Sequence, residues 1–391
     1  MRYSTAMADY ELIVLGAPPA DAPNLLTARL TAVAGEYGMV VPGDLAVRTA
    51  SDAARRNARA STAALYFGGD PSLDAELVAE LESACVPIVP VVPPGGRVLE
   101  TIPSELQAIN AFFDEPANAR IDALAALALE CLGLLRRQRR VFVSYRRDES
   151  RTVAVQLHDE LSARGFDVFL DTHDILPGDM FQEMLWHRLA DCDVVIMLDT
   201  KDYFVSKWTK QELGRSLAQG IQILRVIWPG HQPTRHLTLS DALQLSASDI
   251  DGGGQLVPDK VDEVVRRTES LRSRSVASRH REIAGSLRVQ VERIGGRFEG
   301  IGAHRAMALT LPNGLKIQAY PVVGVPTAEL LNDVHDKAIA TAPGRFPCLA
   351  YDHHGIRPGW RTHLEWLDAQ VKEVRALRVF DAAWELAEWD S

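Results

Sequence analysis

Several charged and aromatic side chains in the middle of the chain have the types and spacing of a ligand site. Arg146 and Arg147 are adjacent, and guanidinium groups bind phosphate oxygens in a fork. Trp208 and Glu212 are four positions apart, so on a helix they lie on one face, one turn apart. An aromatic face of this kind can stack on a planar ring. These residue types suit a ligand that carries phosphate and a planar ring.

A second group of chemically capable residues lies near the carboxyl end, at Asp352, His353 and His354. Imidazole and carboxylate are metal ligands, so these types fit a metal site or a nuclease. Adjacent histidines on an extended chain point to opposite sides, however, and no known ligand spacing repeats in this segment. We therefore predict no metal site here.

The composition is that of a globular chain with several domains. The 391 residues are about two and a half times a typical domain of ~150 residues, which predicts two or three domains. Lys and Arg number 42 against 52 for Asp and Glu, and the net charge of −10 disfavours a nucleic-acid or anionic-membrane partner. No stretch approaches the ~18 apolar residues of a membrane span, and residues 1–10 have no apolar secretory core. We expect a cytoplasmic location.

Short apolar runs alternate with helical periods over the first third of the chain. The expected strands are at 11–16, 39–41, 63–67 and 86–92, and a helix at 118–135 closes the block. Strands that alternate with helices require crossover connections, which predicts a mostly parallel sheet with helices on both faces. We place this first domain at 1–137.

The same order begins again after a basic run at 136–140. The expected strands are at 140–145, 166–170, 193–198 and 221–227, and the expected helices are at 151–163, 179–190 and 206–219. Leu12 corresponds to Val141 and Ala64 to Val195, at offsets of 129 and 131, so the spacing supports an ancient duplication. The predicted fold is α/β, with two tandem flavodoxin-like, doubly wound parallel sheets, the second in a domain at 138–250.

The rest of the chain predicts a linker and helix at 251–285 and a smaller α+β domain at 286–391. Four arginines follow in the next stretch, at Arg272, Arg274, Arg279 and Arg281. They are interpreted as a solvated helix face or connector, with a nucleic-acid patch as the alternative. Asn313-Gly314 is a strong hairpin signal between two expected strands. The remaining expected elements are strands at 306–310, 315–320 and 347–351, a helix at 327–340, and a long helix from 360 to 380.

Several motifs in the middle domain follow one another in an informative order. They are FVSYRRD at 142–148, VFLD at 168–171, ILPG at 175–178 with Phe181, CDVVI at 192–196, then Tyr203, Ser206, Trp208, Glu212-Leu213 and Ile223-Leu224. In this order they resemble the Toll/interleukin-1 receptor (TIR) domain family, over about 139–229.

The resemblance implies one of two roles, since TIR domains either assemble as signalling scaffolds or cleave NAD at its nicotinamide glycosidic bond. In an open parallel sheet, ligands bind outside the carboxyl ends of the strands. This rule places Tyr145, Arg146, Arg147 and Asp171 around one crevice, together with the helix that Ser206 is expected to cap.

Loss of nicotinamide needs no general acid, because the pyridinium leaves as a neutral molecule. The difficulty is the positive charge that develops on ribose, and a carboxylate beside that carbon stabilises it. Glu212 is the candidate for this role. Arg146 and Arg147 suit the pyrophosphate or the adenosine side, and Phe181 and Trp208 offer faces for nicotinamide. NAD+ is then a substrate, and no cofactor is expected.

Each assignment has a structural alternative. Glu212 could be a solvated helix residue paired with Arg215, Trp208 could belong to the core, and Arg146 and Arg147 could be surface charge or assembly contacts. These alternatives stay open at the level of sequence.

The function predicted for the chain is NAD+ glycohydrolase activity, with nicotinamide and ADP-ribose or a cyclic variant as products. The resemblance implies an antiviral or abortive-infection effector that self-association of TIR domains activates, with a protein or a nucleotide signal as trigger. The first domain has Gly16-Ala17-Pro18 where the second has its arginines, so we interpret it as a degenerate copy. The alternatives are a non-catalytic TIR scaffold that recruits other TIR proteins, and a nucleotide-signal sensor or nuclease in the last domain.

Overall fold

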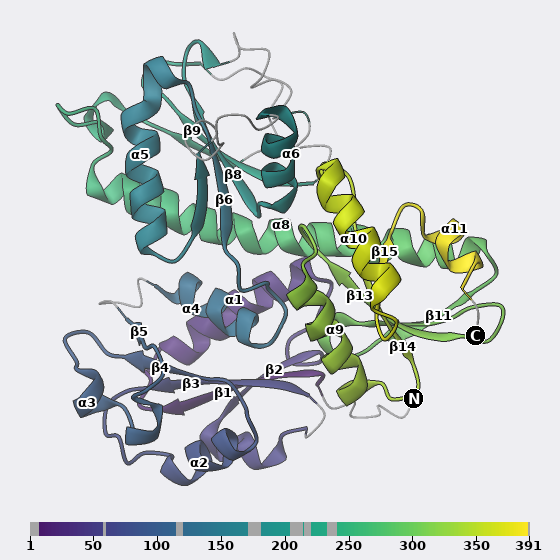
Figure 1. The fold of residues 1–391 in the computed structure, drawn as a ribbon. Coiled ribbons are helices and arrows are strands. Elements are labelled where there is room, and N and C mark those ends of the chain that lie inside the picture. Colours follow the sequence, from purple (N-terminus) through teal and green to yellow (C-terminus); the bar gives the residue numbers. More distant parts are fainter. Residues whose placement is uncertain are drawn as a thin grey trace. The chain divides into compact units, whose positions relative to one another are not determined.

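The computed structural model describes residues 8–57, 60–114, 120–170, 181–203, 214, 220–232 and 241–389. The chain divides into two compact units. The first comprises Met1–Arg137 with Gly302–Arg305, and the second comprises Gln138–Ile301 with Ala306–Ser391 (Figure 1).

The first unit contains a five-stranded parallel sheet with the strand order β2-β1-β3-β4-β5. Its strands are β1 (Tyr10–Gly16), β2 (Leu45–Thr49), β3 (Ser61–Phe67), β4 (Ile88–Val92) and β5 (Phe112–Phe113), and its helices are α1 (Ala22–Glu36), α2 (Ala75–Ser83), α3 (Val98–Thr101) and α4 (Ile121–Cys131). The strand expected at 39–41 is wrong. Pro42 and Gly43 lie in a turn there, and the buried apolar pair Leu45 and Ala46 begins the strand instead.

The second unit begins with another five-stranded parallel sheet, in the order β10-β9-β8-β6-β7. Its elements are β6 (Arg140–Ser144), α5 (Arg147–Ala163), β7 (Asp167–Leu170), α6 (Phe181–Asp191), β8 (Val194–Asp199), β9 (Gln222–Ile227) and β10 (Asp241–Gln244). Counted along the chain, both sheets have the order second, first, third, fourth, fifth, which is the flavodoxin-like order. The predicted tandem of doubly wound sheets is therefore confirmed.

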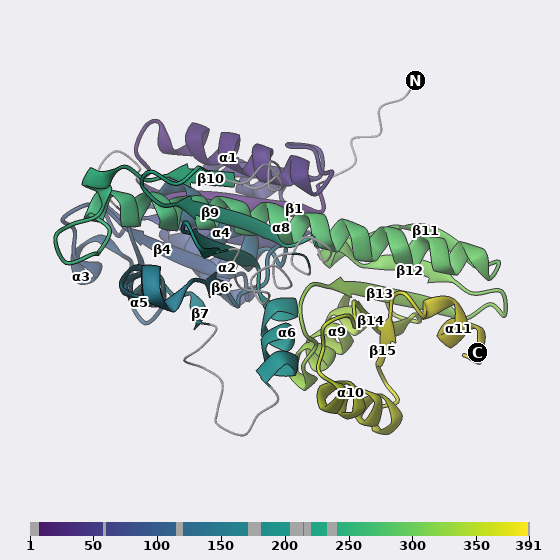
Figure 2. The same ribbon diagram turned by 90° about the horizontal axis from the view of Figure 1, so that it is seen from above.

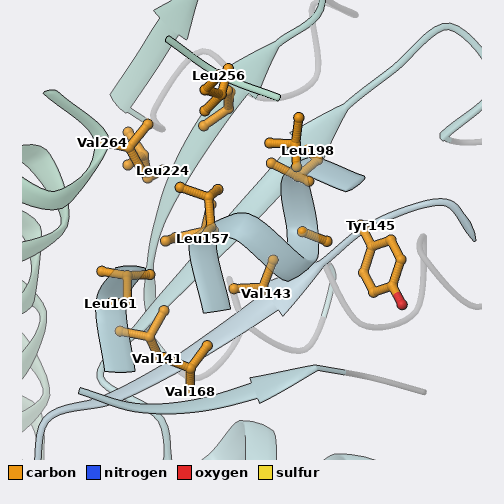
Figure 3. Packing of buried hydrophobic residues seen from close by; sticks show 14 of the residues in the cluster. Val141, Val143, Tyr145, Leu157, Leu161, Val168, Leu198, Leu224, Leu256 and Val264 are labelled. Carbon is orange, nitrogen blue, oxygen red and sulfur yellow. The ribbon is translucent and has the colours of Figure 1, made fainter. Parts of the chain in front are cut away.

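Both faces of the second sheet are apolar because its strands alternate between two cores. Val141 and Val143 of β6 point to a cluster with Leu157 and Leu161 of α5 (Figure 3). Phe142, between them, belongs to the opposite cluster with residues of α6. Parallel strands buried on both faces appear in sequence as continuous apolar runs, which is why these strands were predictable.

A single helix, α8 (Pro258–Arg293), packs against two sheets. This 36-residue helix contacts β8 and β9 of the second sheet and, farther along, the third sheet (Figures 1 and 2). The predicted boundary between 285 and 286 therefore falls inside one helix.

Two arginines of α8 are buried, which corrects the expectation of a solvated face. Arg272 has no exposed surface, and its Nε lies 3.1 Å from Asp193 Oδ2. Its Nη1 lies 3.4 Å from Glu269 Oε1. Arg279 donates to the carbonyls of Cys192 and Ala190, at 2.8 and 2.7 Å. These bonds join α8 to the chain just before β8.

The third sheet has the order β11-β12-β13-β14-β15 and is mixed. Its strands are β11 (Arg297–Ile301), β12 (Met307–Thr310), β13 (Lys316–Val322), β14 (Phe346–Tyr351) and β15 (Arg375–Arg378), and its helices are α9 (Ala328–Thr341), α10 (Pro358–Gln370) and α11 (Ala382–Ala387). β11, β12 and β13 are antiparallel, whereas β13, β14 and β15 are parallel. α9 and α10, the helices of the two crossovers, lie on one face, and α8 lies on the other (Figure 2).

The expected long helix from 360 to 380 is wrong in its second half. The helix ends at Gln370, and β15 follows with Ala376 and Leu377 buried. Because buried strands and helix faces are both apolar, periodicity alone could not separate them. Among the described helices, none is both long and apolar enough for a membrane crossing.

We predict that Arg272→Ala lowers the free energy of unfolding of the second unit by about 3–5 kcal/mol, because it removes the buried cation that pairs with Asp193. Urea unfolding followed by circular dichroism measures the change. Arg274→Ala, on the exposed side of the same helix, is the matched control and should change stability by less than ~0.5 kcal/mol. Equal effects of the two variants would contradict the role given to Arg272.

Candidate functional site

Only part of the predicted site lies within the described residues. Asp171, Ser206, Trp208 and Glu212 lie outside them, as does the side chain of Phe181, which begins α6. The roles given to these residues therefore stay predictions. Tyr145, Arg146 and Arg147 are described, and all three lie where β6 ends and α5 begins.

The carboxyl end of β6 is tied to the segment after β8. The hydroxyls of Ser144 and Tyr203 are hydrogen-bonded at 2.6 Å and are buried. Arg146 donates from Nη1 to the carbonyl of Asp202 at 2.6 Å. Because β6 and β8 are neighbours in the sheet, these bonds fix the end of β6 against the segment that follows β8.

The three described site residues have different surroundings. Tyr145 is 3% exposed and belongs to the core cluster, where Figure 3 shows its ring at the end of the row of β6 side chains. Arg146 is half-buried and bonded to the Asp202 carbonyl. Arg147 is exposed at the first position of α5. Of the two guanidinium groups, that of Arg147 is the more exposed.

A buried ionic group that sequence analysis missed lies at the same edge. Asp199, the last residue of β8, is fully buried and pairs with Arg225 of β9. His231 Nε2 lies 3.3 Å from Asp199 Oδ1. The backbone amide of Trp228 also donates to the Asp199 carbonyl, at 3.0 Å. The one available signal was Arg225, a charge within the otherwise apolar strand ILRVI.

The Asp199 group contributes rigidity. A buried carboxylate is stable only when a cation or several donors face it, and Arg225 provides that charge. The carboxyl ends of β8 and β9 thus carry a charged group of fixed position at the edge where ligands of such sheets bind.

The helix that follows residues 171–180 is held by the carboxyl-terminal part of the same unit. Asp191, at the end of α6, pairs with Arg140 and accepts a hydrogen bond from the Val325 amide at 3.0 Å. The Arg357 amide donates to His187 Nδ1 at 3.4 Å, and the Trp360 ring lies 5.9 Å from the His187 ring. The third sheet and its helices therefore position α6.

Among the described residues, Asp352, His353 and His354 could hold a metal, and the expectation that the two histidines point to opposite sides is wrong. Their rings are stacked, with centroids 4.5 Å apart. The strand ends at Tyr351, so the histidines lie in a turn and the alternation of an extended chain no longer applies.

Comparison with known proteins identifies the middle of the chain. Residues 141–257 match the family model described as TIR domain. The chain is also 34% identical over 74 residues to a Brachypodium distachyon protein named "Probable 2' cyclic ADP-D-ribose synthase BdTIR". That match covers 19% of this chain and 33% of the relative, so the chain spans about a third of the relative's length.

Among solved structures, the chain resembles the C-terminal domain of glucosamine-fructose-6-phosphate aminotransferase from Francisella tularensis, at 11% identity. The likeness covers 70% of this chain and 84% of that chain, with a TM-score of 0.21. A TM-score this low supports no structural argument.

We predict that Asp199→Asn lowers the free energy of unfolding by about 3 kcal/mol, because the buried Arg225 guanidinium loses its counter-charge. Adding Arg225→Met should recover part of the loss, which chemical denaturation of the single and double variants measures. If the loss of stability in the double variant equals the sum of the losses in the two single variants, the two groups are not energetically coupled.

We also predict that the stability contributed by His187 depends on pH. Burial lowers the pKa of His187 from 6.5 to about 4. The charged groups that act on it are Asp191, Arg357, Arg188 and Arg140. Because the unfolded chain binds the proton more readily, this contribution is present above pH 6.5 and is lost as the pH falls towards 4.

His187→Gln tests this prediction. The stability difference between wild type and variant should shrink between pH 7 and pH 4.5 in urea unfolding. His335→Gln, a histidine in contact with Asp336 near the surface, is the control. A difference that stays constant over this pH range would contradict the prediction.

Proposed function

Because residues 141–257 are a TIR domain, we propose that this chain binds NAD+ at the carboxyl edge of its second sheet and breaks the bond between nicotinamide and ribose. The family match carries the proposal. The relative named for 2' cyclic ADP-D-ribose synthesis supports it, since making cyclic ADP-ribose from NAD+ requires the same bond to break.

The proposed chemistry follows from the charge that develops in the reaction. The pyridinium takes the bonding electrons and leaves as neutral nicotinamide, so ribose becomes cationic at the carbon that held it. Glu212 is proposed to lie beside this carbon and to stabilise the cation. Water then adds to give ADP-ribose and a proton, or a hydroxyl of the same molecule adds to give a cyclic product.

The described geometry supports a phosphate-binding role for Arg147. It is exposed at the start of α5, where the amino-terminal end of the helix also favours negative charge. Arg146 is proposed to act indirectly, by holding the crevice through its bond to Asp202. We propose that Asp171, Ser206, Phe181 and Trp208 complete the site.

We further propose that the chain is a cytoplasmic antiviral effector that becomes active when TIR domains of several copies assemble. In this proposal a neighbouring copy completes each site, so isolated chains are nearly inactive. A protein or a nucleotide signal would then act by promoting assembly, and the third sheet is placed to influence it through α6.

The test is incubation of the purified full chain with NAD+, followed by chromatography of nicotinamide, ADP-ribose and cyclic ADP-ribose. We predict activity that rises more steeply than protein concentration, and a loss of at least ~100-fold in Glu212→Ala. Glu160→Gln is the matched control, because Glu160 lies on α5 in a surface pair with Arg164. It should retain wild-type activity.

The outcomes separate the proposal from its alternative. Equal activity of wild type and Glu212→Ala would remove Glu212 from the reaction. An assembled protein that consumes no NAD+ would favour a TIR scaffold that recruits other TIR proteins.

Arg147→Ala should raise KM for NAD+ more than it lowers kcat, as expected for a group that binds phosphate in both ground and transition states.

A further inference from the structure

Three consecutive polar residues converge where β14 ends in the third sheet. Asp352, His353 and His354 each offer one ligand atom, and these atoms lie within 4.8 Å of one another. Tetrahedral zinc binds nitrogen and oxygen at about 2.0–2.2 Å, so its ligand atoms lie roughly 3.4 Å apart. Side-chain rotations that move the ligand atoms by about an ångström would therefore bring all three atoms to one ion.

The local backbone explains why the three residues converge. Asp352 Oδ1 accepts from the His354 amide at 2.9 Å, and the Ile356 amide donates to the His353 carbonyl at 3.3 Å. Gly355, at φ +80°, completes the turn in the left-handed conformation that favours glycine. The turn places both imidazoles on the same side of the chain, with stacked rings.

A fourth oxygen comes from the neighbouring strand. β14 and β15 are parallel with Tyr351 opposite Arg378, so their carboxyl ends are adjacent. Asp381, three residues beyond Arg378, places Oδ2 3.9 Å from His353 Nε2. Among the described residues, Nδ1 of His353 is buried without a hydrogen-bond partner.

Arg378, a cation beside Asp381, is also paired with other carboxylates. Arg378 Nε donates to Glu385 at 2.6 Å and lies 3.6 Å from Asp381 Oδ2. Its Nη1 also lies 3.8 Å from Glu365. Because Arg378 has carboxylate partners on α10 and α11, Asp381 can turn towards the histidines without leaving that guanidinium unpaired.

We propose that Asp352, His353, His354 and Asp381 form a binding site for a divalent cation of the zinc class. Two imidazoles with carboxylates suit Zn²⁺ and Co²⁺, whereas Mg²⁺ and Ca²⁺ prefer all-oxygen sites. Asp352 Oδ1 and His354 Nδ1 share a hydrogen bond at 2.6 Å, and the bound ion takes the place of the shared proton. The ion joins the ends of β14 and β15, and this proposal does not depend on NAD+ cleavage.

The test uses the untagged full chain, freed of metal by a chelator. Calorimetry with Zn²⁺ should give one equivalent bound, and Co²⁺ should give visible d–d bands without the near-ultraviolet charge transfer of a thiolate. Double replacement by His353→Ala and His354→Ala should weaken binding by more than ~100-fold. Its circular dichroism spectrum should match that of the wild type.

His363→Ala is the matched control, because His363 lies nearby on α10 but stacks on Trp366 and is not part of the group of four. It should bind Zn²⁺ as the wild type does, and Zn²⁺ should raise the melting temperature of both proteins but not of the double variant. Wild type that binds no Zn²⁺, undiminished binding by the double variant, or thiolate charge transfer with Co²⁺ would each overturn the proposal.

Discussion

The second unit is organised around the fully buried guanidinium of Arg272. A buried charge must stay close to its counter-charges, so α8 cannot slide along the second sheet without separating Arg272 from Asp193. The bonds from Arg279 to the carbonyls of Cys192 and Ala190 fix the same helix at a second position, farther along α8. Because α8 also covers a face of the third sheet, this pairing sets the second and third sheets relative to each other.

A consequence concerns α6, the helix that follows Asp171 in the chain, because segments next to the third sheet are bonded to it. Asp191 receives the Val325 amide, and His187 receives the Arg357 amide, so α6 is bonded to the segments that lead into α9 and α10. α6 directly follows the stretch that contains Asp171. A change at the third sheet, such as metal binding between β14 and β15, would therefore occur in the part of the unit whose segments are bonded to α6.

Sequence patterns predicted the features that depend on residues close together in the chain. They missed the features that depend on residues far apart in it. Buried parallel strands, such as β6 and β8, are short apolar runs, and the duplicated order followed from them. Arg272 and Asp193 are 79 positions apart, so nothing local distinguished a buried arginine from a solvated one. Likewise Asp199 meets Arg225 and His231 only because β8 and β9 pair, and the turn after β14, not the residue types, brings His353 against His354.

The two copies of the strand order differ at the carboxyl ends of their first strands. At the end of β1, Gly16 (φ +75°) lies so close to β3 that a Cβ would meet the Phe67 carbonyl oxygen at 2.1 Å. The Ala17 amide closes this approach by donating to the same carbonyl at 2.8 Å. β6 instead ends in Ser144, which is bonded to Tyr203, and leads to Arg146, which donates to the Asp202 carbonyl, and to the exposed Arg147. A shared topology thus supplies the same edge twice, and the two edges differ where the first strand ends: β1 ends in Gly16 and leads to Ala17, whereas β6 leads to Arg146 and Arg147.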